Sequence, residues 1–233
     1  MIIIWIIICS DFSVALNRGS FAAQENSTED PNLGYLAFGG IAPVNTTNTS
    51  ITTSIQGYTV SSNSSNVYLW YTVDVDTYSF DGSKPLTGAG KQAILDTGTT
   101  LNYVPTNVAK AYNSKFVPKA TFNVTEDTYY VSCNATVPAF TVEIAGTNFT
   151  VDGQDQIIPA GTDINGNEVC ISGTQDGGDP SNPEVIYILC VRSCPPSVIL
   201  TNEFIRGDVF LHNVVVTFNI QTNMVTLTQR APY

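Results

Sequence analysis

The stretch that decides the fold is AILDTGTTLNYVP, residues 93–105. Three apolar residues lead into Asp96, and a turn of small hydroxyl residues around Gly98 separates it from further apolar chain. This order predicts a strand, a tight turn and a second strand, with Asp96 where the first strand ends. A carboxylate there is partly desolvated and needs donors, which the Gly98 and Thr99 amides and the Thr99 hydroxyl can supply. An ordinary β-turn that begins with Asp would carry the same tripeptide.

Two further residues of the turn have expected roles. Gly98 lets the backbone approach the carboxylate closely, because it has no Cβ. Thr97 is β-branched and is expected to face inward and brace the turn. Asp96 is therefore the candidate catalytic residue, and Thr97, Gly98, Thr99 and Thr100 are its expected support.

The composition around this stretch is that of a mainly β protein. Val, Thr, Ile, Tyr and Phe fill the apolar segments, and Gly, Asn, Ser and Pro separate them. One helix is expected at 106–116, and 45–66 reads as a Ser/Thr/Asn-rich link with short strands. Alternation or apolar runs predict strands in 11–18, 34–40, 67–82, 128–133, 140–146, 147–158, 185–189, 209–220 and 224–230. Many short strands joined by turns indicate an all-β barrel or sandwich-like lobe.

Charge and residue content exclude several kinds of function. A net charge of −11 and a pI near 4.2 argue against nucleic acid as a partner. With His212 as the single histidine, a histidine metal cluster is excluded and a Ser-His-Asp triad nearly so, and His212 itself is expected to be an ordinary outward strand residue. No phosphate-binding glycine motif occurs. No metal or cofactor is expected, and carboxylate chemistry remains.

Glycosylation motifs favour a secreted or vacuolar glycoprotein. The N-x-[ST] motif occurs at seven asparagines: Asn26, Asn45, Asn48, Asn63, Asn123, Asn134 and Asn148. The N-terminal MIIIWIIIC is too short to span a bilayer and lacks the positive segment of a signal peptide. It can be a buried strand, a poor signal peptide or a wrongly assigned gene start, and we favour the last. No membrane span is expected.

Several segments together resemble the pepsin-like aspartic endopeptidases, in the style of secreted fungal members. AILDTGTT resembles the second active-site motif of that family, FSVALNR and GYLAFGG the end of its N-terminal lobe, and GDVFLHNVVVTFNI its closing strands. The resemblance implies an all-β fold with essentially one, C-terminal, β-barrel lobe, a partial inter-lobe sheet and one or two short helices. It divides the chain into an anomalous 1–11, an inter-lobe part 12–44 and a C-terminal catalytic lobe 45–233.

The resemblance also implies a chemistry and its limit. Two aspartates, one from each lobe, share a proton and activate a water that attacks a peptide or protein substrate. Asp96 matches the second of the pair, with Thr97 gripping the other lobe's loop and Thr99 orienting the carboxylate. Asp96-Thr97-Gly98 is the only Asp-Thr-Gly in the sequence, so this chain is expected to need the missing N-terminal lobe and to be inactive alone. A one-Asp homodimeric protease and a noncatalytic module that binds peptide or cell-wall material are the alternatives.

A second departure from the family is internal. The family runs an apolar strand like 185–189 directly into the Gly-Asp of 207–208, but here 190–206 intervenes with two Pro, two Arg and two Cys. We expect a retained intron; a real surface insertion closed by Cys190 and Cys194 is the alternative. Cys133 and Cys170 match the family's disulfide, whereas Cys9, Cys190 and Cys194 fall in the two anomalous segments.

Overall fold

The computed structural model describes residues 10–18, 34–59, 66–68, 70–80, 82–178 and 203–232. The expectations for 1–9, for Asn26 and Asn63, for the strand at 185–189 and for Cys190 and Cys194 lie outside these residues. Within them the protein is built almost entirely of strands, with two short α-helices and one 3-10 turn. The all-β prediction is confirmed.

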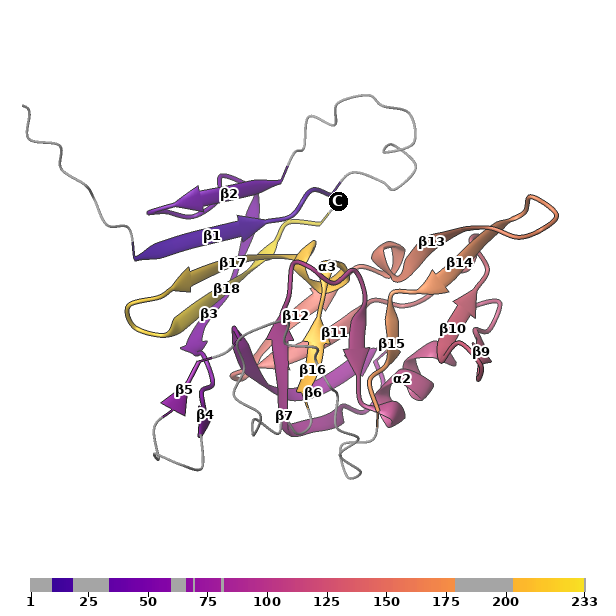
Figure 1. Cartoon of the computed structure of the whole chain (residues 1–233), viewed down its shortest axis with the longest axis horizontal. Helices are drawn as coiled ribbons and strands as arrows, with labels where there is room; N and C mark the ends of the chain where they lie inside the picture. Colours follow the sequence, from indigo (N-terminus) through magenta and orange to yellow (C-terminus); the bar gives the residue numbers. More distant parts are fainter. Residues whose placement is uncertain are drawn as a thin grey trace, which may run out of the picture.

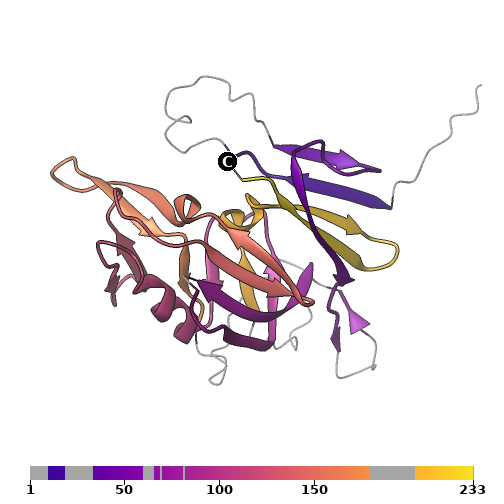
Figure 2. The ribbon, with the colours of Figure 1, turned by 180° about the vertical axis from the view of Figure 1, so that it is seen from behind.

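A five-stranded antiparallel sheet joins the two ends of the described chain (Figures 1 and 2). Its order is β2 (Tyr35–Phe38), β1 (Asp11–Ala15), β17 (Val214–Asn219), β18 (Met224–Arg230) and β3 (Thr46–Ser54). One face packs on the core, where the rings of Phe12 and Phe218 stack at 4.9 Å between centroids. The predicted strand forms over Asp11–Ala15, and its most buried side chains are those of Ser13 and Ala15, while Phe12 and Val14 are half-buried.

A seven-stranded sheet carries the main core and curls beside the first sheet (Figure 1). Its order is β12 (Thr147–Val151), β11 (Phe140–Ile144), β6 (Thr72–Phe80), β7 (Leu86–Leu95), β16 (Glu203–Arg206), β8 (Asn102–Val104) and β15 (Thr174–Asp176). Most neighbours are antiparallel, but β16 runs parallel to β7. Val73 and Val75 of β6 are buried while Asp74 is exposed, so one face of this predicted strand packs on the core and the other meets solvent.

The remaining strands form two smaller sheets. One has the order β13 (Ile157–Thr162), β14 (Glu168–Ser172), β10 (Thr128–Val131) and β9 (Thr121–Asn123); the other pairs β4 (Tyr58–Thr59) with β5 (Asn66–Val67). A disulfide links Cys133 to Cys170 next to β10 and β14, as the resemblance implies. The hairpin of β13 and β14 projects from the body of the protein (Figures 1 and 2).

The helical segments correct two predictions. The predicted helix forms as α2 (Thr106–Asn113), whose Val108, Ala109 and Tyr112 face the core, and a 3-10 turn spans Gly153–Gln156. Residues 209–211 were predicted to be strand but form α3 (Asp208–Leu211). In a segment of only four residues, the spacing of the apolar side chains does not distinguish a helix from a strand. His212 is accordingly not an outward strand residue: it caps α3 and is half-buried.

The segment predicted to be a link is a regular strand instead. Thr46–Ser54 forms the nine-residue β3, with side chains that alternate between exposed and half-buried positions. Hydroxyl groups bridge it to β18, at 2.9 Å between Ser50 and Thr228 and 2.8 Å between Thr52 and Thr226. These cross-strand bonds satisfy the hydroxyl groups, so a segment without apolar alternation still forms a sheet edge.

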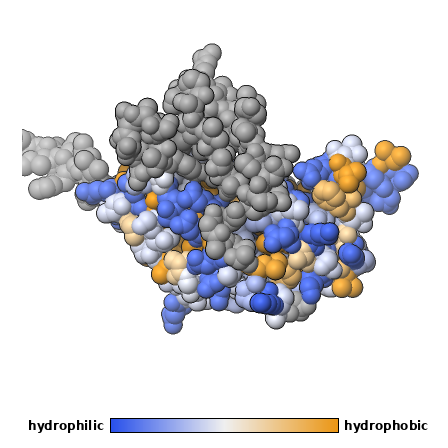
Figure 3. Space-filling view, turned by 90° about the horizontal axis from the view of Figure 1, so that it is seen from below, coloured by the Kyte–Doolittle hydropathy of each residue, from blue (hydrophilic) through white to orange (hydrophobic). Residues whose placement is uncertain are grey.

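The described surface carries exposed apolar residues at the end of the five-stranded sheet. Leu36 is 60%, Phe38 71% and Ile41 64% exposed, on β2 and just after it. On the face seen in Figure 3, by contrast, hydrophilic and hydrophobic residues are interspersed. No helix of the described chain has the length and apolar character needed to cross a membrane.

Candidate active site

Asp96 follows directly on β7, where backbone bonds to two other segments fix it. The Leu95 amide donates to the Tyr71 carbonyl at 2.9 Å, and the Asp96 amide donates to the Arg206 carbonyl at 3.0 Å. Ala93, Ile94 and Leu95 are buried, because β7 lies inside the sheet between β6 and β16. The apolar run of the sequence therefore places Asp96 at the edge of the core.

The turn after Asp96 holds both oxygens of its carboxylate. The Gly98 amide donates to Oδ1 at 2.8 Å, and the Thr99 hydroxyl donates to Oδ2 at 2.7 Å. A Cβ at Gly98 would lie 3.2 Å from Oδ1, which is tighter than ordinary contact. Thr97 does not face inward in this chain: it is exposed, as is Thr100. The carboxylate is half-buried, with one backbone donor and one hydroxyl donor to fix its orientation.

A second segment, from far along the chain, closes on this turn. The Asp208 amide donates to the Thr99 carbonyl at 2.8 Å, and the Val209 amide donates to the Thr100 carbonyl at 3.1 Å. A Cβ at Gly207 would lie 2.3 Å from the Thr99 carbonyl oxygen, so only glycine permits this approach. The start of α3 therefore holds the Asp96 turn in place.

Asp208 is a site residue that the sequence reasoning missed. Burial, and then the charge of Asp96, raise the pKa of its carboxyl to about 6. Its Oδ1 is buried and has no hydrogen-bond partner in the described chain. The sequence did contain a sign of this role, because Asp208 directly follows Gly207 in a segment that resembles the family. Two carboxyl groups thus influence each other at the end of β7.

Arg206 places a charge in the core beside the site. Its side chain is 0% exposed, and its Nη1 donates to the carbonyls of Tyr103 at 2.9 Å and Ile205 at 3.1 Å. Nη2 donates to the hydroxyl of Tyr78, whose ring lies 5.1 Å from the guanidinium carbon. Nε has no partner among the described residues. Burial lowers the pKa of Arg206, although a guanidinium stays charged.

His212 lies on the other side of α3 and takes no part in the Asp96 site. Its Nδ1 is 4.0 Å from Oδ1 of Asp155. Burial lowers the pKa of His212, and the charges of Arg230 and Arg18 lower it further against the opposing effect of Asp155.

Comparisons with known proteins agree on one family. The family model described as eukaryotic aspartyl protease matches residues 12–230. A probable aspartic-type endopeptidase of Aspergillus fumigatus is 34% identical over 215 residues, which cover 90% of this chain and 42% of that protein. An acid protease of Saccharomycopsis fibuligera is 23% identical over 214 residues, 92% of this chain and 47% of that protein. The chain thus spans less than half the length of the curated relatives it matches.

Proposed function

Because the chain belongs to the eukaryotic aspartyl protease family, we propose that it supplies one of the two catalytic carboxylates of an acid endopeptidase, that of Asp96. The observation that carries this proposal is the geometry of the turn. A half-buried carboxylate at the end of a core strand has a fixed donor on each oxygen, from Gly98 and from Thr99. Such an arrangement orients a carboxylate toward a substrate more narrowly than a solvated surface turn would.

The proposed chemistry is general acid–base catalysis with water as the nucleophile. Of two carboxyl groups in contact, only one ionises readily, so the ionised one takes a proton from water and the protonated one donates to the scissile carbonyl. The peptide bond is then cleaved through a tetrahedral intermediate. The substrates are peptides or proteins, and the pH range is acidic because one of the two carboxyl groups has to remain protonated.

The second carboxylate is proposed to come from polypeptide outside these 233 residues. Asp96-Thr97-Gly98 is the only motif of its kind in the sequence. The exposed Leu36, Phe38 and Ile41 support a missing partner lobe, since an apolar patch at a sheet end is a usual contact surface. Alone, the chain is expected to be proteolytically inactive. We also propose that it passes through the secretory pathway to the extracellular space or the vacuole.

A matched set of proteins tests the proposal. The purified chain, its Asp96→Asn variant, and a longer product of the same gene that includes the upstream coding region are assayed for acid proteolysis of a denatured protein. We expect cleavage only by the longer product, blocked by a statine-type inhibitor and lost on Asp96→Asn. Inhibitor-sensitive cleavage by the 233-residue chain would refute the need for a second lobe.

The remaining results separate the alternative functions. If the chain is active and elutes as a dimer, each copy contributes one Asp96, as in a homodimeric protease. If the upstream region encodes no second Asp-Thr-Gly and the longer product is inactive, the chain is a noncatalytic relic that keeps the fold. A pull-down on immobilised peptide and cell-wall polysaccharide then identifies what it binds.

A further inference from the structure

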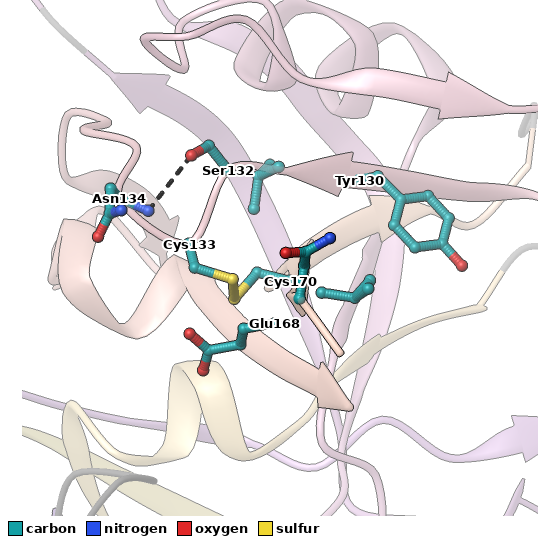
Figure 4. A pocket seen from close by; sticks show the side chains of 9 residues that line it. Tyr130, Ser132, Cys133, Asn134, Glu168 and Cys170 are labelled. Atoms are coloured by element: carbon teal, nitrogen blue, oxygen red, sulfur yellow. Dashed lines mark hydrogen bonds between the residues drawn. A yellow bond between two sulfur atoms is a disulfide. The ribbon is translucent and has the colours of Figure 1, made fainter. Parts of the chain in front are cut away.

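A polar pocket lies beside the disulfide, and the glycosylation motif of Asn134 is at its rim. The pocket has a volume of about 470 Å³ and lies along β10 and β14. Asn134 is at one end and Tyr130 at the other, with the disulfide between them and Glu168 below (Figure 4). We propose that Asn134 carries an N-linked glycan whose first sugar lies in this pocket.

The Asn134 side chain is available for modification. It is exposed, and no hydrogen bond of its side-chain amide is found within the described chain; the one bond at this residue runs from its backbone amide to the Ser132 hydroxyl, at 3.4 Å. Asn123, which has the same motif, differs: it is half-buried, its Oδ1 accepts from the Thr125 amide at 2.9 Å, and its Nδ2 donates to Glu126 at 3.1 Å. The nitrogen that would carry the sugar is thus engaged at Asn123 and not at Asn134.

The backbone around Asn134 is fixed on both sides, so an attached sugar would leave from a defined point. Cys133 is held by its disulfide. The Ala135 amide donates to the Ser132 carbonyl at 2.9 Å, and Ala135 itself is buried. Thr136 exchanges two backbone bonds with Val117, at 2.8 and 2.9 Å. A ligand attached here loses little additional freedom on entering the neighbouring pocket.

The lining of the pocket suits a sugar. Ser132, Asn167 and Glu168 bring a hydroxyl, an amide and a carboxylate, which can exchange hydrogen bonds with sugar hydroxyl and acetamido groups. The Tyr130 ring and two valines supply apolar surface. A metal is a poor alternative occupant, because the two sulfurs near the Glu168 carboxylate are joined in the disulfide and are not thiolates.

This inference rests on the secretory route proposed above but not on protease activity. The full chain is therefore directed through the secretory pathway of a yeast with a heterologous leader. Peptide mapping after amidase release in heavy-oxygen water reports which asparagines carried a glycan. We expect modification of Asn134, and loss of one glycan mass in Asn134→Gln. A secreted chain with unmodified Asn134 would overturn the proposal, whatever its activity.

The position of the sugar is tested by its rate of release. We expect the amidase to remove the Asn134 glycan much more slowly from native than from denatured protein. The glycan of Asn45, an exposed residue just before β3 that does not line this pocket, is the control in the same molecules. The Glu168→Ala variant should raise the native release rate at Asn134 while occupancy stays unchanged. Equal native and denatured rates at Asn134, with or without Glu168, would refute a seated sugar.

Discussion

Replacement of Arg206 by methionine should stabilise the folded chain. The Arg206 side chain is fully buried and forms its hydrogen bonds only with two carbonyls and a phenol. No carboxylate of the described chain forms an ion pair with it. Methionine keeps the unbranched stem and fills most of the volume while it removes the charge.

The sign of the effect follows from two opposing contributions. Removal of the guanidinium removes its hydrogen bonds to the Tyr103 and Ile205 carbonyls and to the Tyr78 hydroxyl, and each of these contributes about 1 kcal/mol. Against this, a buried charge without an ionic partner carries a desolvation penalty of several kcal/mol, which the apolar methionine does not have. We expect a net gain of about 2 kcal/mol, or roughly 4–8 °C in Tm for a chain of this length.

Chemical and thermal unfolding at pH 7 measure the change. Arg206→Lys is the matched control, because lysine keeps the charge but loses the guanidinium's hydrogen-bonding geometry, and it should be less stable than the parent chain. If Arg206→Met unfolds at lower denaturant concentration than the parent, with an unchanged slope, the hydrogen bonds of the guanidinium outweigh its desolvation and the reasoning fails.

Three further results are expected. The pKa of Asp208 is about 6 in the folded chain, above the 3.8 of an unperturbed aspartate, so the folded state binds more protons between these values and its stability falls as the pH rises from about 4 to 6. The Asp208→Asn variant should flatten this part of the profile of unfolding free energy against pH, and it should gain on the order of 1 kcal/mol at pH 7 after allowance for solvent screening. An unchanged profile would contradict the raised pKa. Replacement of Cys133 and Cys170 by alanine opens a loop closed across 37 residues, and the chain-entropy model predicts a loss of about 4 kcal/mol in the free energy of unfolding. Denaturant unfolding measures this loss. A loss under about 1 kcal/mol would show that the loop is already restricted in the unfolded chain. The transcript should join the codon of Leu189 directly to that of Gly207, in which case the spliced protein lacks β16 and the buried Arg206 of this chain; a cDNA that retains all the intervening codons would refute the retained intron.

Much of the Asp96 site could be predicted because its signals are local. The turn brings its own donors, so Gly98 and Thr99 lie where the sequence order places them. Strand β6 was predictable for a similar reason, since Val73 and Val75 repeat at the period of a strand with one buried face. Such features depend on neighbours within a few residues, which a sequence displays directly.

The features that were missed depend on distant partners. Strand β3 has no apolar alternation and is held by hydroxyl bonds such as Thr52 to Thr226, which only the folded register reveals. The role of Asp208 arises because α3 approaches the Thr99 turn, more than a hundred residues earlier in the chain. The burial of Arg206 contradicts composition-based reasoning, which would place a guanidinium at the surface.

The two sides of the Asp96 turn differ in a way that bears on catalysis. On the core side, the carboxylate is positioned by this chain alone, through Gly98, Thr99 and the amides at the start of α3. On the other side, Thr97 and Thr100 are exposed, although the Thr100 carbonyl accepts from the Val209 amide at 3.1 Å. Orientation of one carboxylate is thus complete within the chain, whereas proton sharing between two catalytic aspartates needs a second group on the exposed side. A folded but inactive chain is what this division predicts, and restoring activity should require added polypeptide rather than substitutions around Asp96.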